Sequence, residues 1–216
     1  MFGKWDDWIK KIEGEVLQIY LDRYIWNELG KIFNENPGLQ RSLFIEWMAR
    51  NYAVAQSMAV RRQTDMHPDS ISLCKLLYDM CLHSECLTSS HHEELYKNHN
   101  SPDGFGREVF SKWCKEGETA INTEMIKEDS QTLNDNSALI KKSVNKHVAH
   151  HDKKGSDVLP TFDDLDRAID TLGEIFNKYR EIITGNPLDQ LVPEIQGDDW
   201  LAPLRIPWIS GDKFEH

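Results

Sequence analysis

The amino-acid sequence predicts an all-α fold, an up-and-down helical bundle of four to six helices with an extended C-terminal tail rich in proline and tryptophan. Apolar residues recur three or four positions apart through several long stretches, which is the spacing of one face of an α-helix. No strong alternation of apolar and polar residues marks a strand. Helices that each carry one apolar face must bury those faces against one another, which favours a bundle.

The first two helices are defined by this spacing and by the residues that stop it. The first runs through residues 5–33 and ends at the sequence NENPG, residues 34–38. The second covers residues 41–65. It is stopped at His67-Pro68, because a proline keeps the residue before it out of the helical conformation.

The middle of the chain is predicted to be less regular. A third helix begins at a cap formed by Asp69 or Ser70 and continues to His83. Residues 84–106 are rich in histidine, serine and asparagine, and we interpret them as a loop. The remaining apolar spacing predicts helical pieces at residues 93–97, 105–115 and 132–150.

The last helix is the most strongly marked. Thr161 is a typical N-cap, and Asp164 stands at the third helical position, which is a carboxylate variant of the capping box. An apolar stripe follows as far as Gly185, a residue type common at helix C-termini. We therefore predict a bundle over residues 1–185 and an extended tail over residues 186–216, which packs on the bundle or on a protein partner.

Charge and cysteine content exclude several classes of protein. Lys and Arg number 25 and Asp and Glu number 36, so the formal net charge of −11 repels nucleic-acid backbones and anionic lipid. Any RNA-binding surface must therefore be local. No stretch has the apolar length of a signal peptide or a membrane span, and the four cysteines include no C-x-x-C pair. We expect a cytoplasmic protein with reduced thiols and no membrane association.

Positive charge is concentrated in residues 141–154, where five lysines stand with one acidic residue, Asp152, for a local balance of +4. The same patch holds three histidines whose spacing places them on one face of a helix: His147, His150 and His151. Histidine is the side chain best suited to proton transfer near neutral pH. With Asn145 and the lysines, these histidines could hold a phosphodiester and move protons on and off a ribose 2′-hydroxyl without a metal.

Simpler interpretations compete with this one. Lysines at a helix C-terminus stabilise the helix dipole, and the histidines can form a solvated face or an interface. As metal ligands, the three histidines have no fourth partner beyond Asp152. A second set of candidate ligands follows no common spacing: Cys81, Cys86, His91 and His92. We therefore expect neither a metal nor a cofactor.

The basic patch resembles part of a known family. The run VNKHVAHHDKKG, residues 144–155, followed by the helix at 160–185, resembles the HEPN superfamily (higher eukaryotes and prokaryotes nucleotide-binding). The resemblance is to its bacterial abortive-infection, AbiU-like branch, where the pattern R-N-K-x-x-A-H-x-D precedes the last long helix. The run YAVAQSMAVRRQTDMHPDSISLCKLLYDM, residues 52–80, is similar to the arginine-bearing helix of that branch and to the helix after it.

The resemblance implies a bundle that is usually dimeric, in which active members place an Arg-x4-6-His motif at the dimer cleft and cut RNA. His150 matches the motif histidine and Asn145 the residue after the arginine, but Val144 occupies the arginine slot. His150 is then the candidate acid or base, and His147 assists it. The candidate phosphate-binding residues are Asn145, Lys146, Lys142 and Arg62.

Arg61 and Arg62 are a second source of positive charge, upstream of the motif. If the bundle brings their helix beside the motif, one arginine could replace the lost phosphate clamp. Alternatively, Arg62 pairs with Asp65, three residues further on, or ties down Ser70 and Ser72.

Two functions from different classes follow. The first is a homodimeric HEPN-like protein of bacterial defence or toxin-antitoxin type that binds RNA through the 141–154 patch and cuts it without metal. The second is a non-catalytic dimerisation or interaction module of the same fold, whose tail recruits a protein partner. The missing arginine and the net acidity favour the second, and the surviving basic patch favours the first.

Overall fold

The computed structural model describes residues 1–36, 42–97, 101–148, 159–195 and 200–205, and these residues form eight α-helices and no β-strand. The all-α prediction is confirmed. The four longest helices are α1 (Phe2–Glu35), α2 (Leu43–Gln63), α6 (Thr123–Asn136) and α8 (Phe162–Thr184). The shorter elements are α3 (Leu73–Leu82), η1 (Ser84–Cys86), α4 (Ser89–Lys97), α5 (Phe105–Ser111), α7 (Ala138–Ser143), η2 (Val144–Val148) and η3 (Ala202–Arg205).

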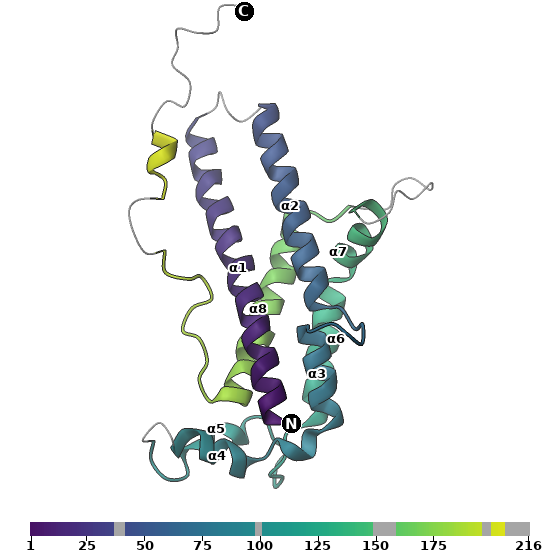
Figure 1. The fold of residues 1–216 in the computed structure, drawn as a ribbon, viewed down its shortest axis with the longest axis vertical. Coiled ribbons are helices and arrows are strands. Elements are labelled where there is room, and N and C mark those ends of the chain that lie inside the picture. The colour runs from purple at the N-terminus through teal and green to yellow at the C-terminus, as the bar shows by residue number, and fades with distance from the viewer. Residues whose placement is uncertain (37–41, 98–100, 149–158, 196–199, 206–216) are drawn as a thin grey trace, which may run out of the picture.

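The long helices lie side by side, and two short ones close one end of the bundle (Figure 1). α8 packs against α1, α2 and α6, and α3 packs against α6, while α4 and α5 lie together near the N-terminus. The core occupies the half of the bundle nearer α4 and α5, because the buried residues of α1 end at Tyr20 and those of α2 begin at Gln56. None of the described helices is apolar over enough of its length to cross a bilayer.

Short-range capping signals set several helix ends. At the start of α8 the predicted capping box is present: the Asp164 N–H donates to Thr161 Oγ1 at 3.2 Å, and the Thr161 N–H donates to Asp164 Oδ2 at 2.9 Å. Gly185 ends α8 in the left-handed conformation, at a φ of 69°. The cap of α3 lies two residues beyond the predicted one, because Ser72 Oγ is the acceptor for the Lys75 N–H, at 3.1 Å.

The helix predicted at residues 132–150 is wrong in its extent. The chain instead forms α6 from Thr123, after an asparagine cap, and then α7 and η2 after a break at Ser137. Ile126 and Leu133 are the buried residues of α6. A polar helix with two buried apolar residues has no clear apolar stripe, so the spacing of apolar residues does not reveal it.

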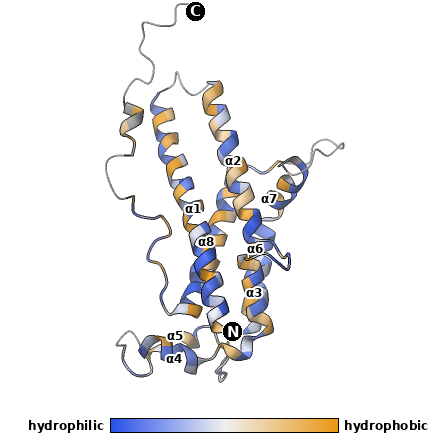
Figure 2. Cartoon of the chain, in the orientation of Figure 1, coloured by the Kyte–Doolittle hydropathy of each residue, from blue (hydrophilic) through white to orange (hydrophobic). Residues whose placement is uncertain are grey.

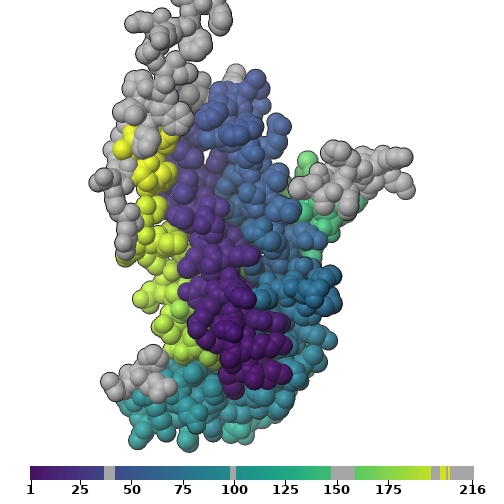
Figure 3. All heavy atoms as spheres, viewed as in Figure 1, coloured from purple at the N-terminus to yellow at the C-terminus, as the bar shows by residue number. Residues whose placement is uncertain are grey.

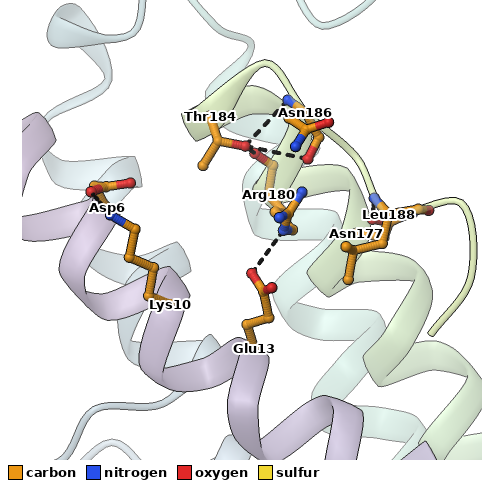
Figure 4. Close-up of polar contacts among 8 residues, drawn as sticks. All are labelled: Asp6, Lys10, Glu13, Asn177, Arg180, Thr184, Asn186 and Leu188. Atoms are coloured by element: carbon orange, nitrogen blue, oxygen red, sulfur yellow. Dashed lines mark hydrogen bonds and ion pairs between the residues drawn. The ribbon is translucent and has the colours of Figure 1, made fainter. Parts of the chain in front are cut away.

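The first residues after α8 run back along the bundle. The Asn177 side chain holds the backbone of Leu188, accepting from its N–H at 2.7 Å and donating to its carbonyl oxygen at 2.9 Å. Leu188 and Leu191 pack against the core. Nearby, Arg180 Nε of α8 donates to Glu13 Oε2 of α1 at 2.8 Å (Figure 4). This charged contact and the Asn177 contact fix the C-terminal half of α8 between α1 and the returning chain.

Candidate functional site

The motif segment, residues 138–148, consists of α7 and η2 and packs against α2 (Figure 1). Ile140 and Val144 stand one turn apart and are almost fully buried, so they fix one face of the segment onto the bundle. Lys142 and Asn145 are exposed. The segment therefore presents polar side chains to solvent from an anchored backbone.

The arginine slot of the motif faces the core. Val144 occupies this slot and is 1% exposed. It is also the first residue of η2, a turn of π-helix, whose wider hydrogen-bonding pattern shifts the register of the side chains that follow. A guanidinium at this position would lie among apolar residues, where an unpaired charge is strongly disfavoured. The motif segment thus offers no surface position for a cation at residue 144.

A cation reaches the motif segment from α2 instead. Arg61 Nε donates a hydrogen bond to Asn145 Oδ1 at 2.8 Å. The Arg61 side chain is half-buried, and Asn145 is exposed. Because the asparagine amide is uncharged, this contact orients the guanidinium without neutralising it.

Arg62, a candidate phosphate-binding residue, contacts α1. Its Nε donates to Glu15 Oε2 at 3.3 Å, and the Gln63 amide donates to the same oxygen at 2.7 Å. Gln63 Oε1 in turn accepts from the Leu73 N–H at 3.1 Å, so this polar group joins α1, α2 and α3. Arg62 therefore pairs with α1 and not with the aspartate three residues further on. The junction also fixes the end of α2 that carries Arg61.

The structure places part of the predicted site. Lys142 and Lys146 lie on the motif segment beside Asn145, the first exposed and the second half-buried. The backbone of His147 belongs to η2, but its side chain and the whole of His150 lie outside the described residues. The roles of both histidines stay predictions.

The contact between Arg61 and Asn145 was not singled out from the sequence, which favoured Arg62. Successive helical residues point about 100° apart, so Arg61 and Arg62 leave α2 in different directions. Val60 and Gln63 are buried, which places the two arginines on opposite sides of the inward face of α2. The buried pattern of α2 was the available signal, but the neighbour on each side depends on the tertiary fold.

The alternative metal ligands are engaged elsewhere. His92 is buried, with its ring nitrogens 3.0 Å from the carbonyl oxygen of Gly106 and 3.3 Å from that of Glu181. His91 stacks on Phe2, with ring centroids 3.4 Å apart. Within the part of the chain that the structure describes, no three His, Cys, Asp or Glu side chains gather as a metal site. The four cysteines are all described, and all are free.

The helical bundle and its motif segment agree with the HEPN class that the resemblance implies. The HEPN family model described as AbiU2 matches residues 2–201. The chain belongs to the AbiU2 family, which confirms the resemblance found in the sequence and indicates an HEPN-like protein of abortive infection. No curated protein and no solved structure matches the chain.

Proposed function

We propose that this AbiU2-family protein acts in bacterial defence by cutting RNA without a metal ion, at a site formed by the motif segment and α2. The observation that supports the proposal is the hydrogen bond from Arg61 to Asn145, which holds a charged guanidinium beside the motif. Lys142 and Lys146 lie on the same segment. Guanidinium, ammonium and amide donors together suit the oxygens of a phosphodiester.

The proposed reaction is attack by the RNA on its own backbone. A base takes the proton from a ribose 2′-hydroxyl, the freed oxygen attacks the adjacent phosphorus, and the 5′-oxygen leaves and takes up a proton. The products are a 2′,3′-cyclic phosphate and a 5′-hydroxyl end. His150 and His147 supply the base and the acid, and Asn145 with the lysines stabilises charge on the phosphoryl oxygens.

Cleavage of a mixed single-stranded RNA pool by the full chain, with EDTA present, tests this function. His150→Ala is expected to lower the rate about 10²- to 10⁴-fold, the usual contribution of a general acid or base, and His147→Ala to lower it less. His67→Ala is the matched control, because His67 is exposed between α2 and α3, outside the motif segment. Equal rates for the wild type and His150→Ala, or cleavage that EDTA abolishes, would contradict the proposal.

An exposed apolar surface favours a second function, a dimerisation module without catalysis. The α1–α2 arm, residues 21–35 of α1 and 43–55 of α2, contains no buried residue. Figure 2 shows hydrophobic residues along both helices of the arm. Leu43, Phe44 and Trp47 are exposed by 82%, 53% and 57%. Apolar side chains gathered on a surface in this way are typical of a contact with another protein.

A second copy of the chain is the partner that fits the arm. Two helices alone make little core, whereas two arms related by a two-fold axis form a four-helix bundle. Glu46 and Arg50 are exposed one turn apart on α2, so antiparallel pairing sets each beside the opposite charge. The chain's own tail lies against α1: the Trp200 ring is 6.2 Å from that of Tyr24, and Figure 3 shows α2 open on this face.

Light scattering after size-exclusion chromatography tests this contact. Trp47→Glu is expected to convert a wild-type dimer into a monomer, because it forces a charge into an apolar interface. Tyr78→Glu is the control, since Tyr78 of α3 is 50% exposed and lies outside the arm. A monomeric wild type, or a Trp47→Glu protein that stays dimeric, would rule out the arm. A dimer that never cuts RNA would favour the second function over the first.

A further inference from the structure

Within the part of the chain that the structure describes, the Arg61 guanidinium has one hydrogen-bond partner, Asn145. Its Nε makes the hydrogen bond at 2.8 Å, and its terminal N–H groups make none with the other described residues. Among the same described residues, the Asn145 side chain takes part through its oxygen, and its amide nitrogen has no partner. An arginine fork anchored through Nε presents two parallel N–H groups, the arrangement that binds two oxygens of one phosphate.

The other cations beside the motif are less suited to this role. Arg62 is paired with the Glu15 carboxylate, so its charge is already compensated. Lys142 and Lys146 carry ammonium groups, which bind phosphate as point charges without a planar fork. Among the described residues, Arg61 is the arginine that contacts the motif segment.

Arg61 also lies beside the slot that lacks its arginine. Val144, in that slot, is buried, whereas Asn145, the next residue, meets Arg61 at the surface. We propose that Arg61 replaces the absent motif arginine and binds a phosphate group of the RNA, an inference that rests on the proposed RNA-directed function. α2 supplies the guanidinium, and Asn145 sets its orientation.

RNA binding and RNA cleavage by Arg61→Ala and Arg62→Ala, measured side by side, test the inference. Binding is followed by fluorescence anisotropy of a labelled single-stranded RNA with EDTA, in a His150→Ala background that keeps the RNA intact. Arg61→Ala is expected to weaken binding about tenfold and to reduce the slope of log K against log salt by about 0.7, the value for one phosphate contact on a single strand. Arg62→Ala is expected to change affinity by less than about twofold, because Arg62 is exposed and already paired, and Gln63 still joins α2 to Glu15 and Leu73 in this variant.

Two further variants separate charge from shape. Asn145→Asp places a carboxylate against Arg61, so binding is expected to fall as in Arg61→Ala although the arginine is still present. Arg61→Lys keeps the charge and loses the fork, so the salt slope is expected to stay while the cleavage rate falls. A purely structural role for Arg61 would change the melting temperature and leave the salt slope alone in every variant.

The outcomes distinguish this inference from the function on which it rests. If the wild type cuts RNA and Arg61→Ala binds and cuts like it, the inference is overturned and the proposed function stands. If the wild type binds RNA with a salt slope that depends on Arg61 but does not cut it, phosphate binding stands and the proposed cleavage fails. If the wild type neither binds nor cuts RNA, both fail.

Discussion

The end cap, formed by α4 and α5, and the motif segment differ in how they use their polar groups. In the end cap, the buried Glu93 carboxylate accepts the N–H of Gly104 at 2.7 Å and that of Arg107 at 3.2 Å. In the motif segment, Asn145 and Arg61 contact each other at the surface, and their remaining N–H groups make no hydrogen bond with other described residues. The Glu93 carboxylate uses its hydrogen bonds inside the end cap, whereas Arg61 and Asn145 have N–H groups that no other described residue occupies.

Because of this difference, the end cap contributes mainly to the stability of the fold, and the motif segment contributes mainly to ligand binding. Buried polar groups with full sets of partners give a region one well-defined arrangement, and losing a partner costs free energy. Exposed donors add little to stability, but they are available to bind anionic groups. Substitutions in the end cap should therefore lower the free energy of unfolding and leave RNA binding unchanged. Substitutions at Arg61 should weaken RNA binding and leave the free energy of unfolding unchanged.

The largest expected effect comes from putting an arginine back into the motif slot. Val144→Arg places a guanidinium in a position that is 1% exposed, and it is expected to lower the free energy of unfolding by about 3–5 kcal/mol. For the same reason it is not expected to restore RNA binding to Arg61→Ala. Chemical denaturation and the anisotropy assay measure the two effects.

Leu139→Arg is the matched control for this change. Leu139 lies on the same segment but is 40% exposed, so the free energy of unfolding should change by no more than about 0.5 kcal/mol. A Val144→Arg protein as stable as the wild type that also rescues Arg61→Ala would show that the slot opens to the surface. The motif segment itself would then carry a cation to the RNA from residue 144.

A smaller loss of stability is expected in the end cap from Gly106→Ala. A Cβ at Gly106 would lie 2.6 Å from Glu93 Cα and 2.7 Å from the His92 carbonyl oxygen, and both are backbone atoms that cannot turn aside. α4 and α5 must separate, which we expect to cost about 1–3 kcal/mol in chemical denaturation. RNA binding should stay at the wild-type level.

Gly14→Ala gives the control for the residue change itself. A Cβ at Gly14, inside α1, would meet nothing within 4 Å. Alanine there is expected to raise the free energy of unfolding by about 0.5–1 kcal/mol, because alanine is the better helix former. Equal stability of Gly106→Ala and Gly14→Ala would mean that the end cap tolerates a wider spacing of α4 and α5.

A helix of this fold could be predicted from the sequence where its caps and its apolar stripe lie within the helix itself. α8 was found correctly because its cap at Thr161, its apolar stripe and its end at Gly185 are all written within the helix itself. The start of α6 at Thr123 was missed, because its first nine residues carry few apolar side chains. That helix is held by its contacts with α3 and α8, which no short window of sequence contains.

In the candidate site, too, the features within one run of sequence could be predicted, and those that depend on distant contacts could not. The resemblance located the motif and its Val144 slot, because both belong to one continuous run of sequence, whereas the burial of Val144 is seen only in the structure. Which arginine reaches Asn145 depends on the rotation of α2, set by distant partners such as Glu15, to which Arg62 is committed. The π-helical turn at η2 likewise has no distinct sequence signature.

The smallest expected effect is a dependence of end-cap stability on pH. The N–H of Gly104, and after it that of Arg107, lowers the pKa of Glu93 below its ordinary value of 4.5. A carboxyl whose pKa is lower in the folded state stabilises the fold above its unfolded pKa. That contribution is lost as the pH falls from about 4.5 through the folded pKa.

Glu93→Gln removes this titration and keeps the size of the side chain. The melting temperature of the wild type should exceed that of Glu93→Gln most clearly near pH 7, and the gap should narrow below pH 4.5. Glu116→Gln, at an exposed position after α5, should follow the wild type at every pH. The salt slope for RNA should be the same in Glu93→Gln as in the wild type, because the end cap lies at the other end of α3 and α6 from the motif segment (Figure 1). A changed slope would mean that the two regions are coupled, and order in the end cap would then be part of how the motif segment binds RNA.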